Sequence, residues 1–321
     1  MSHYRTVKWP TLVVFAFAAL MMTSPAFALD IQGHRGARGL LPENTLPAFS
    51  RALDARVTTL ELDCGVTRDG VVVIAHDAAL NPDIARDAGG RWIQSPAPAI
   101  WRLTYDELQR YDVGRLDPDS AYARRFPKQQ PVDGTRIPRL ADLFGLVRER
   151  GDPAVRFNIE TKISPLAPDE TPAPEAFVQA LLAEIRNAGV AARVTIQSFD
   201  WRTLQIAQKE APEIPTAYLT AERTSPDKFS DASPWTAGYR LSAFHGSLPR
   251  MIKAAGGAIW SPYAGDLTEE RVREAHALGL KVIVWTVNSE ADMRRLIGWG
   301  VDGIISDYPD VLAAVRQRIG R

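Results

Sequence analysis

The sequence predicts an α/β protein: an eight-stranded parallel (β/α)8 TIM-type barrel with an inserted cap segment. Short apolar runs rich in β-branched residues alternate with longer segments of helical spacing along most of the chain. This strand–helix order is typical of a parallel sheet, and eight such units close a barrel. The expected strands are residues 29–32, 58–63, 71–76, 154–160, 193–197, 216–219, 258–261, 281–285 and 303–306.

One of these runs is expected to lie outside the barrel. Asp69 and Gly70 separate the run 58–63 from the run 71–76. An Asp-Gly pair between two apolar runs is typical of a hairpin turn. Residues 71–76 are therefore predicted to pair antiparallel with the preceding strand, and the remaining eight runs are left to close the barrel.

Helical spacing is clearest in two segments. In residues 45–55, Leu46, Phe49 and Leu53 share one face, and the helix expected at residues 174–187 ends before Gly189. Further helices are expected at residues 201–210, 269–278, 290–299 and 310–319.

Residues 78–135 show neither the alternation of a strand nor the spacing of a helix, and they are rich in Asn, Asp, Pro, Gly and aromatic side chains. The segment is too long for an ordinary connection, and long excursions at the functional face of a barrel usually shape substrate access. We therefore predict an inserted cap, the alternative being a mobile loop with no part in binding. The basic run at residues 124–128 fits either contact with an anionic head group or a solvated surface.

The first 28 residues have the features of a secretory signal peptide. Arg5 and Lys8 precede an uncharged apolar stretch at residues 11–22, and Ala26-Phe27-Ala28 has the small-x-small pattern of a cleavage site. Because that stretch is too short to span a bilayer, we expect residues 29–321 to form a periplasmic or secreted domain without a stable membrane anchor. A retained anchor is the alternative.

The charge balance indicates no nucleic-acid partner. The chain has 38 basic and 38 acidic residues, and loss of Arg5 and Lys8 with the signal leaves 38 − 2 = 36 basic residues. Nucleic-acid binding depends on concentrated positive charge, and no block of Lys and Arg is present. Cys64 is the single cysteine, so an exported chain without an internal disulfide must rest on a large core. The oligomeric state cannot be predicted.

Ionisable residues stand where the early apolar runs end: His34, Glu61, Asp63 and His76. Since strand side chains alternate between two faces, Glu61 and Asp63 point the same way, and two such carboxylates call for a hard divalent cation. Imidazoles titrate near neutral pH and suit acid–base work. The cluster therefore predicts a metal site with two proton carriers. The alternatives are exposed strand carboxylates and structural histidines.

Later runs add further candidates. Glu160 and Lys162 share a face of one strand, where a plain salt bridge is the alternative to a site role. Trp285 and, more weakly, Phe199 are candidates for an aromatic wall beside the substrate, the alternative being packing. Cys64 is expected to face the helices as a small buried hydrophobe. His245 and His276 are not expected to belong to the site.

Short motifs in a fixed order cover almost the whole chain after residue 28. They are His34-Arg35-Gly36, Pro42-Glu43-Asn44-Thr45 with Ala48-Phe49, Glu61-Leu62-Asp63, Thr67-Arg68-Asp69-Gly70, His76-Asp77, Glu160-Thr161-Lys162, Gln197-Ser198-Phe199, Trp285-Thr286-Val287-Asn288 and Gly303-Ile304-Ile305-Ser306-Asp307-Tyr308-Pro309. Together they resemble the glycerophosphodiester phosphodiesterase family.

The resemblance implies metal-dependent hydrolysis of small glycerophosphodiesters to glycerol 3-phosphate and an alcohol. It places one divalent ion, Ca²⁺ or Mg²⁺, on Glu61, Asp63 and Glu160. It makes His34 and His76 the acid–base pair, with His34 as base and His76 as acid in our interpretation. Arg35 and Lys162 would bind the phosphoryl oxygens, and Glu43 would support the first loop or the outer shell of the metal.

Two other functions stay open at this point. The aromatic residues of segment 78–135 leave room for a phospholipase D-type enzyme acting on lysophospholipid or sphingomyelin. A periplasmic binding protein that holds the diester without cleaving it is a third interpretation. No second lobe is evident, however, and binding alone has no need of two proton carriers.

Overall fold

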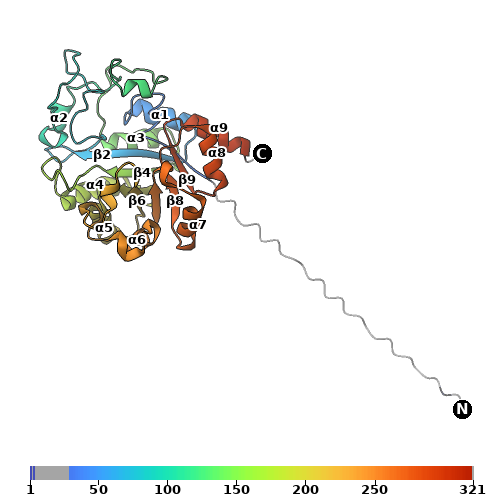
Figure 1. The fold of residues 1–321 in the computed structure, drawn as a ribbon. Coiled ribbons are helices and arrows are strands. Elements are labelled where there is room, and N and C mark those ends of the chain that lie inside the picture. Colours follow the sequence, from blue (N-terminus) through green and yellow to red (C-terminus); the bar gives the residue numbers. More distant parts are fainter. Residues whose placement is uncertain (2, 4–28, 320–321) are drawn as a thin grey trace.

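The computed structural model describes Met1, His3 and residues 29–319 (Figure 1). Apart from Met1 and His3, the predicted signal segment 1–28 lies outside the described part of the chain. In that part, no helix has both the length and the apolar character needed to cross a membrane.

An eight-stranded parallel barrel forms the centre of the fold, as predicted. Within residues 29–319 the strands are β1 (Asp30–Gly33), β2 (Thr59–Val66), β3 (Val72–Ile74), β4 (Arg156–Thr161), β5 (Val194–Ser198), β6 (Thr216–Thr220), β7 (Ile259–Pro262), β8 (Lys281–Val284) and β9 (Gly303–Ser306). β1 pairs with both β2 and β9, which closes the ring. β3 pairs antiparallel with β2, so the hairpin expected at residues 69–70 is confirmed.

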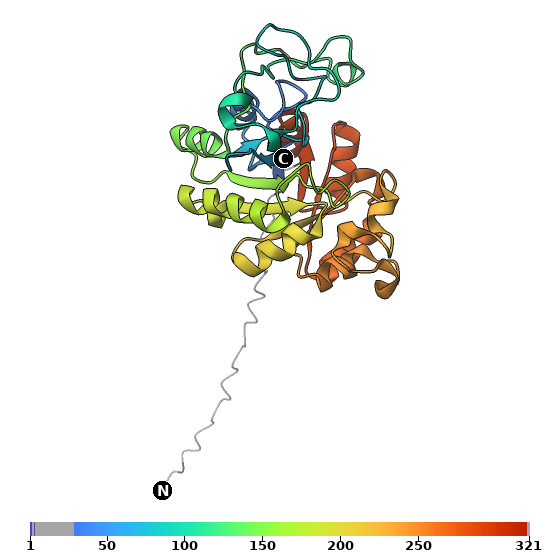
Figure 2. The same cartoon turned by 90° about the vertical axis from the view of Figure 1, so that its left-hand side faces the viewer.

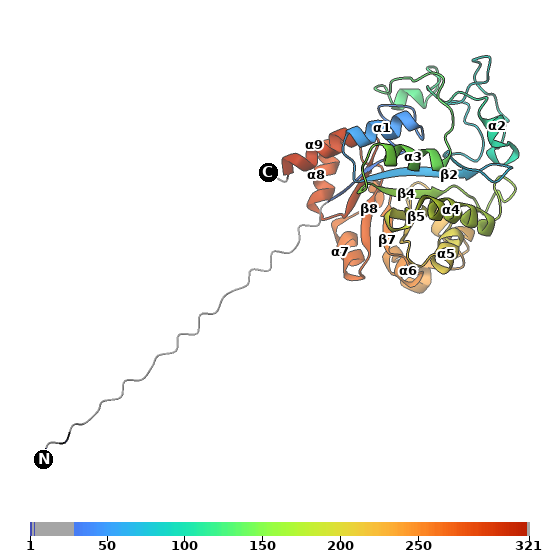
Figure 3. The ribbon, with the colours of Figure 1, turned by 180° about the vertical axis from the view of Figure 1, so that it is seen from behind.

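Helices cover the outside of the barrel (Figures 1 and 3). They are α1 (Leu46–Asp54), α2 (Tyr105–Leu108), α3 (Leu140–Glu149), α4 (Pro174–Ala188), α5 (Trp201–Glu210), α6 (Leu248–Ala254), α7 (Glu269–Ala277), α8 (Glu290–Gly298) and α9 (Pro309–Ile319). The six expected helices are present. The sequence did not predict the short α2, nor α3, which buries Leu140, Leu143 and Phe144, nor the short α6, which contains Pro249.

The alternation of strand side chains separates the main core from the interior of the barrel. Leu62 and Cys64 belong to the large apolar core outside the strands. Their neighbours Glu61 and Asp63 are also buried but take part in a polar network. β2 therefore delivers two carboxylates to one side, as its sequence predicts.

Residues 78–135 are folded around a small apolar core of their own. Leu80, Ile84, Ile100, Leu108 and Val113 are buried together in it. The segment forms a lobe beside α1 and α3, drawn in cyan to green in Figures 1 to 3. Its part in substrate access stays a prediction.

A second long connection, which the sequence did not predict, joins β6 to α6. Residues 221–247 contain three short 3₁₀ helices: η4 (Pro226–Phe229), η5 (Pro234–Thr236) and η6 (Leu241–Phe244). Because this connection leaves the carboxyl end of a parallel strand, it lies on the face of the barrel where such folds place their chemistry.

Candidate active site

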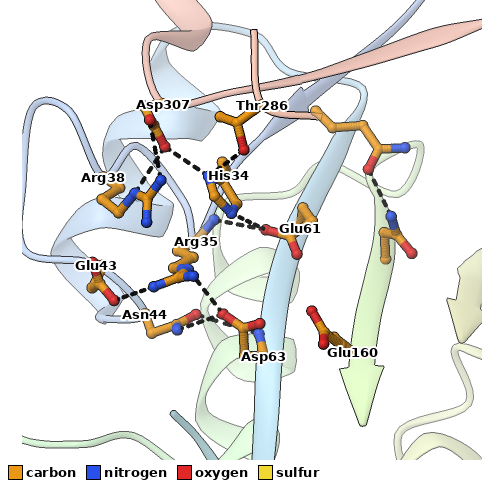
Figure 4. Close-up of polar contacts among 12 residues, drawn as sticks. His34, Arg35, Arg38, Glu43, Asn44, Glu61, Asp63, Glu160, Thr286 and Asp307 are labelled. Carbon is orange, nitrogen blue, oxygen red and sulfur yellow. Dashed lines mark hydrogen bonds and ion pairs between the residues drawn. The ribbon is translucent and has the colours of Figure 1, made fainter. Parts of the chain in front are cut away.

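Three buried carboxylates meet at the ends of two neighbouring strands. Glu61 and Asp63 lie on β2, and Glu160 lies directly opposite Asp63 on β4. One oxygen from each lies within 4.8 Å of the others (Figure 4). Gln197 donates a 2.7 Å hydrogen bond to Glu61 Oε1, and Asn44 donates a 2.9 Å bond to Asp63 Oδ2. Glu61 and Asp63 are therefore each oriented by an uncharged donor.

The loop after β1 turns sharply over these carboxylates. Arg35 has a φ of 50°, and Gly36 has a φ of 85°. A Cβ atom on Gly36 would lie 2.7 Å from the backbone of Ala48, so only glycine fits there. This turn directs the backbone N–H of Arg35 to Glu61 Oε2, at 2.9 Å.

His34 is fixed by a residue from the other end of the chain. Its Nδ1 lies 2.7 Å from Asp307 Oδ1, and its Nε2 lies 4.0 Å from Glu61 Oε2. Asp307 also accepts hydrogen bonds from Arg38 Nε, at 2.9 Å, and Asn288 Nδ2, at 2.7 Å. Nδ1 of His34 is thus engaged by a carboxylate, while Nε2 faces the acidic cluster.

Burial, followed by the positive charge of Arg38, lowers the pKa of His34 to about 4. Asp307 opposes this shift, but its own charge is matched by Arg38, so burial decides the direction. His34 is consequently a neutral imidazole near pH 7. With Nδ1–H donated to Asp307, the free lone pair lies on Nε2.

Arg35 bridges the first loop and the acidic cluster. Its NH1 lies 2.5 Å from Glu43 Oε1, and its Nε lies 3.1 Å from Asp63 Oδ2 (Figure 4). Tyr122, from segment 78–135, donates its hydroxyl to the other oxygen of Glu43 and accepts a 3.2 Å hydrogen bond from Arg38. Glu43 therefore orients Arg35, and the inserted segment in turn holds Glu43.

His76 and Lys162 lie on the other side of the cluster. His76 Nδ1 is 2.7 Å from Asp77 Oδ1, and Asn81 donates a 2.8 Å bond to the second oxygen of Asp77. Lys162 Nζ is 2.8 Å from Glu160 and 3.8 Å from Asp63. Burial, then the charges of Arg35 and Lys162, lowers the pKa of His76.

A cavity of about 450 Å³ connects these groups. His34, Arg35, His76 and Lys162 all line it. Trp285 and Phe199 also face it and contact each other edge to face, with ring centroids 5.7 Å apart. Of the predicted site residues, Asp63 and Glu43 do not line the cavity; both contact Arg35, which does.

Two histidines and the cysteine lie where the sequence placed them. Cys64 is buried in the outer core, and His276 bonds Asp302 on the surface at 2.8 Å. His245 lies in a separate depression beside Arg250.

The residues that sequence reasoning left without a role are Arg38, Asn44, Gln197, Asn288, Asp307 and Tyr122. Except for Arg38 and Tyr122, these residues fall inside the short motifs quoted above. Membership of a motif was the one signal in the sequence that could have indicated a role for them.

The donor set fits a hard divalent cation. Burial, then repulsion from Asp63, raises the pKa of Glu61 well above its usual value, so its charged form lacks compensation. Burial also raises the pKa of Glu160 to about 7, although Lys162 opposes the shift. Burial favours the same change in Asp63, but Arg35, His76 and Lys162 outweigh it and hold its pKa low. A cation among the three carboxylates would supply the missing charge.

The fold and this site define a family. The model of the glycerophosphoryl diester phosphodiesterase family matches residues 34–311, and the chain belongs to this family.

Individual relatives are also similar over most of their length. A glycerophosphodiester phosphodiesterase of Bacillus altitudinis is 30% identical over 290 residues, which cover 90% of this chain and 98% of the relative. The crystal structure of a candidate family member from Silicibacter pomeroyi is 39% identical, with a TM-score of 0.82 and coverage of 91% of this chain and 94% of that one. A phosphodiesterase of Oleispira antarctica, solved with the product sn-glycerol 3-phosphate, has the same fold at 21% identity and a TM-score of 0.66, covering 91% and 98% of the two chains.

Proposed function

We propose that the protein is an exported, metal-dependent hydrolase that cleaves glycerophosphodiesters to sn-glycerol 3-phosphate and an alcohol, using two histidines. One observation carries the proposal: a triad of buried carboxylates lies in one site with two histidines and two cationic side chains. Cleavage of a phosphodiester requires charge neutralisation at the equatorial oxygens and proton transfer on both sides of phosphorus. The site contains groups for each task, and family membership supports the same reaction.

Glu61, Asp63 and Glu160 would hold one divalent ion, Ca²⁺ or Mg²⁺, which supplies positive charge to the phosphoryl oxygens when bound. Arg35 and Lys162 line the same cavity, as do Arg38 and Arg125, and are the two cationic side chains that contact the carboxylate cluster. Arg35 is kept in position by Glu43, so its guanidinium needs little reorganisation to bind a phosphoryl oxygen.

His34 is proposed as the base. Its neutral Nε2 accepts the proton of the glycerol hydroxyl next to the phosphate, and that oxygen attacks phosphorus while the bond to the leaving alcohol breaks. Asp307 keeps the ring oriented and stabilises the imidazolium that forms. Water then opens the cyclic phosphate: neutral His76 takes a proton from the water, whose oxygen bonds to phosphorus, and His34 returns its proton to the glycerol oxygen as the bond from that oxygen to phosphorus breaks. Both histidines are thereby restored, and the product is glycerol 3-phosphate.

His76 is proposed as the acid that protonates the departing alkoxide. Asp77 stabilises its imidazolium form, whereas burial with Arg35 and Lys162 lowers its pKa and makes the proton easier to give up. The two histidines lie on different connections, after β1 and after β3, and thus reach the phosphate from different directions.

Export to the periplasm or the medium is part of the proposal and rests on the sequence of residues 1–28 alone. It is tested by expressing the full chain with a C-terminal tag and comparing the mass of the mature protein with cleavage after Ala28.

The reaction is tested with a substrate panel. We expect release of glycerol 3-phosphate from a soluble glycerophosphodiester, and a loss of at least about 100-fold in kcat for His34→Ala with the fold retained. His276→Ala, at the surface, is the matched control and should keep full activity. Unchanged activity in His34→Ala would contradict the assignment of this residue.

The same panel separates the other two functions. Much faster cleavage of lysophospholipid or sphingomyelin would favour the phospholipase D-type enzyme. Tight binding of the diester without turnover, in the presence of either metal, would favour the binding protein.

A further inference from the structure

A second hollow of about 200 Å³ adjoins the proposed site on the side of His76. It shares His76, Asp77, Glu160, Lys162 and Phe199 with the larger cavity, and Lys228 and Trp235 are among its other lining residues. His34 and Trp285 line only the larger cavity. If His34 deprotonates the glycerol hydroxyl and His76 protonates the departing oxygen, the hollow beside His76 lies where the leaving alcohol must fit.

Lys228 comes from the unexpected connection between β6 and α6. Its Nζ lies 4.3 Å from the ring centroid of Phe199 and 4.1 Å from that of Trp235. Lys228 forms no ion pair with any residue of the part of the chain that the structure describes. Burial, followed by the positive charge of Lys162, lowers its pKa, while Glu160 opposes the shift.

Aromatic faces attract cations, and paired rings are a common way to bind a quaternary ammonium group. Here the two rings are already occupied by a cation of the protein. A choline head group that entered the hollow would lose this stacking and meet the charge of Lys228. A neutral or anionic alcohol would meet an ammonium donor.

The acidic groups of the hollow do little to attract a cationic head group. Glu160 is paired with Lys162, and Asp77 is bonded to His76 and Asn81. Glu170 also lines the hollow but is exposed, so solvent screens its charge.

We propose that this hollow is the subsite for the leaving alcohol and that Lys228 determines its specificity, disfavouring cationic head groups such as choline and favouring neutral polyols or anionic alcohols. The inference rests on the proposed function and adds the class of alcohol. It requires no contact between Lys228 and the reacting atoms.

The test compares two substrates of the same shape: glycerophosphocholine and the corresponding 3,3-dimethylbutyl ester, in which carbon replaces the charged nitrogen. The protein should hydrolyse the neutral ester with a kcat/KM at least about tenfold higher. Lys228→Met removes the charge but keeps most of the length of the side chain and its packing against the rings, and should bring the ratio to within about threefold of unity. Lys228→Arg keeps the charge and should retain the preference.

Lys209→Met is the matched control, since Lys209 is an exposed lysine on α5, and it should behave like the parent protein. Lys228→Gln serves as a second neutral variant if the Met variant folds poorly. Equal rates on the two esters in the parent protein, or an unchanged ratio in both neutral variants, would overturn the inference. Failure to hydrolyse either ester would instead refute the proposed function.

Discussion

Metal binding should release protons, and the extent follows from the environment of the three carboxylates. Burial raises the pKa of Glu160 to about 7, and burial with repulsion from Asp63 raises the pKa of Glu61 well above its usual value. At pH 6 Glu160 is therefore mostly protonated in the metal-free protein, and the pKa of Glu61 is shifted in the same direction. A cation can take their oxygens as ligands only if the protons leave.

The size of the effect can be worked from one residue. For a pKa of about 7, Glu160 is about 90% protonated at pH 6 and about 10% at pH 8, so it alone weakens the apparent affinity for Ca²⁺ about tenfold at the lower pH. Glu61 acts in the same direction. Tenfold corresponds to about 1.4 kcal/mol of binding free energy.

Calorimetric titration with Ca²⁺ at pH 6, 7 and 8, in buffers of different protonation enthalpy, measures both the affinity and the protons released. Glu160→Gln should bind more weakly at pH 8 and show a shallower pH dependence. Glu175→Gln, an exposed substitution on α4, should match the parent protein. Equal affinities at pH 6 and pH 8, with no proton released, would refute the reasoning.

Three further predictions concern the groups around the acidic cluster. Asp307→Asn should lower kcat about 10- to 100-fold with little change in KM, because His34 loses the carboxylate that orients it. Steady-state kinetics on a soluble diester measure both constants. Asp310→Asn is the control, and an equal fall in its kcat would point to a general loss of stability. Because the pKa of His34 is about 4 in the fold and near 6.5 in the unfolded chain, the unfolded state takes up the proton first as the pH falls, so His34 alone should take about 3 kcal/mol from the stability of the metal-free protein between pH 7 and pH 4. Glu61 and Glu160 act in the opposite direction, because burial raises the pKa of each. Denaturant titrations should therefore show the parent protein losing stability relative to His34→Gln as the pH falls, and a constant difference between the two proteins would speak against the buried neutral imidazole. Tyr122→Phe should lower the free energy of unfolding by about 2 kcal/mol, since the charged Glu43 loses a buried hydrogen bond. An unchanged denaturation midpoint would mean that the inserted segment does not hold Glu43.

The barrel could be predicted because its signals are local. A buried strand such as β8 contains a short apolar run, and a helix such as α5 carries its period within ten residues. The expected ends of the helices agree with the structure to within about one residue. Helix α6 was not predicted because it has seven residues and a proline near its start, and so short a segment does not reveal a helical period.

The acidic cluster was also accessible to local reasoning. Alternation along β2 places Glu61 and Asp63 on one face, and the same rule gives the orientation of Leu62 and Cys64. Parallel pairing then brings the carboxyl end of β4, with Glu160, next to them. Period and sheet order are sufficient for this half of the site.

The partners of the site are not local, which is why they were missed. Asp307 is 273 positions from His34, and the two meet only because the last strand pairs with the first. Lys228 reaches Phe199 through a connection that has neither helical nor strand periodicity. Tyr122 reaches Glu43 from a segment whose fold depends on its own small core. Such contacts form only when segments distant in the sequence come together in the folded chain.

The central claim is that the acidic cluster holds a single ion on which phosphodiester cleavage depends. It is tested most directly by stripping the protein with EDTA and following glycerol 3-phosphate release from a glycerophosphodiester while Ca²⁺ or Mg²⁺ is returned in known amounts. The account predicts no release from the stripped protein and activity that rises in proportion to bound metal, reaching its plateau at one ion per chain. Full activity in the stripped protein, with bound metal below a few hundredths of an ion per chain, would contradict it.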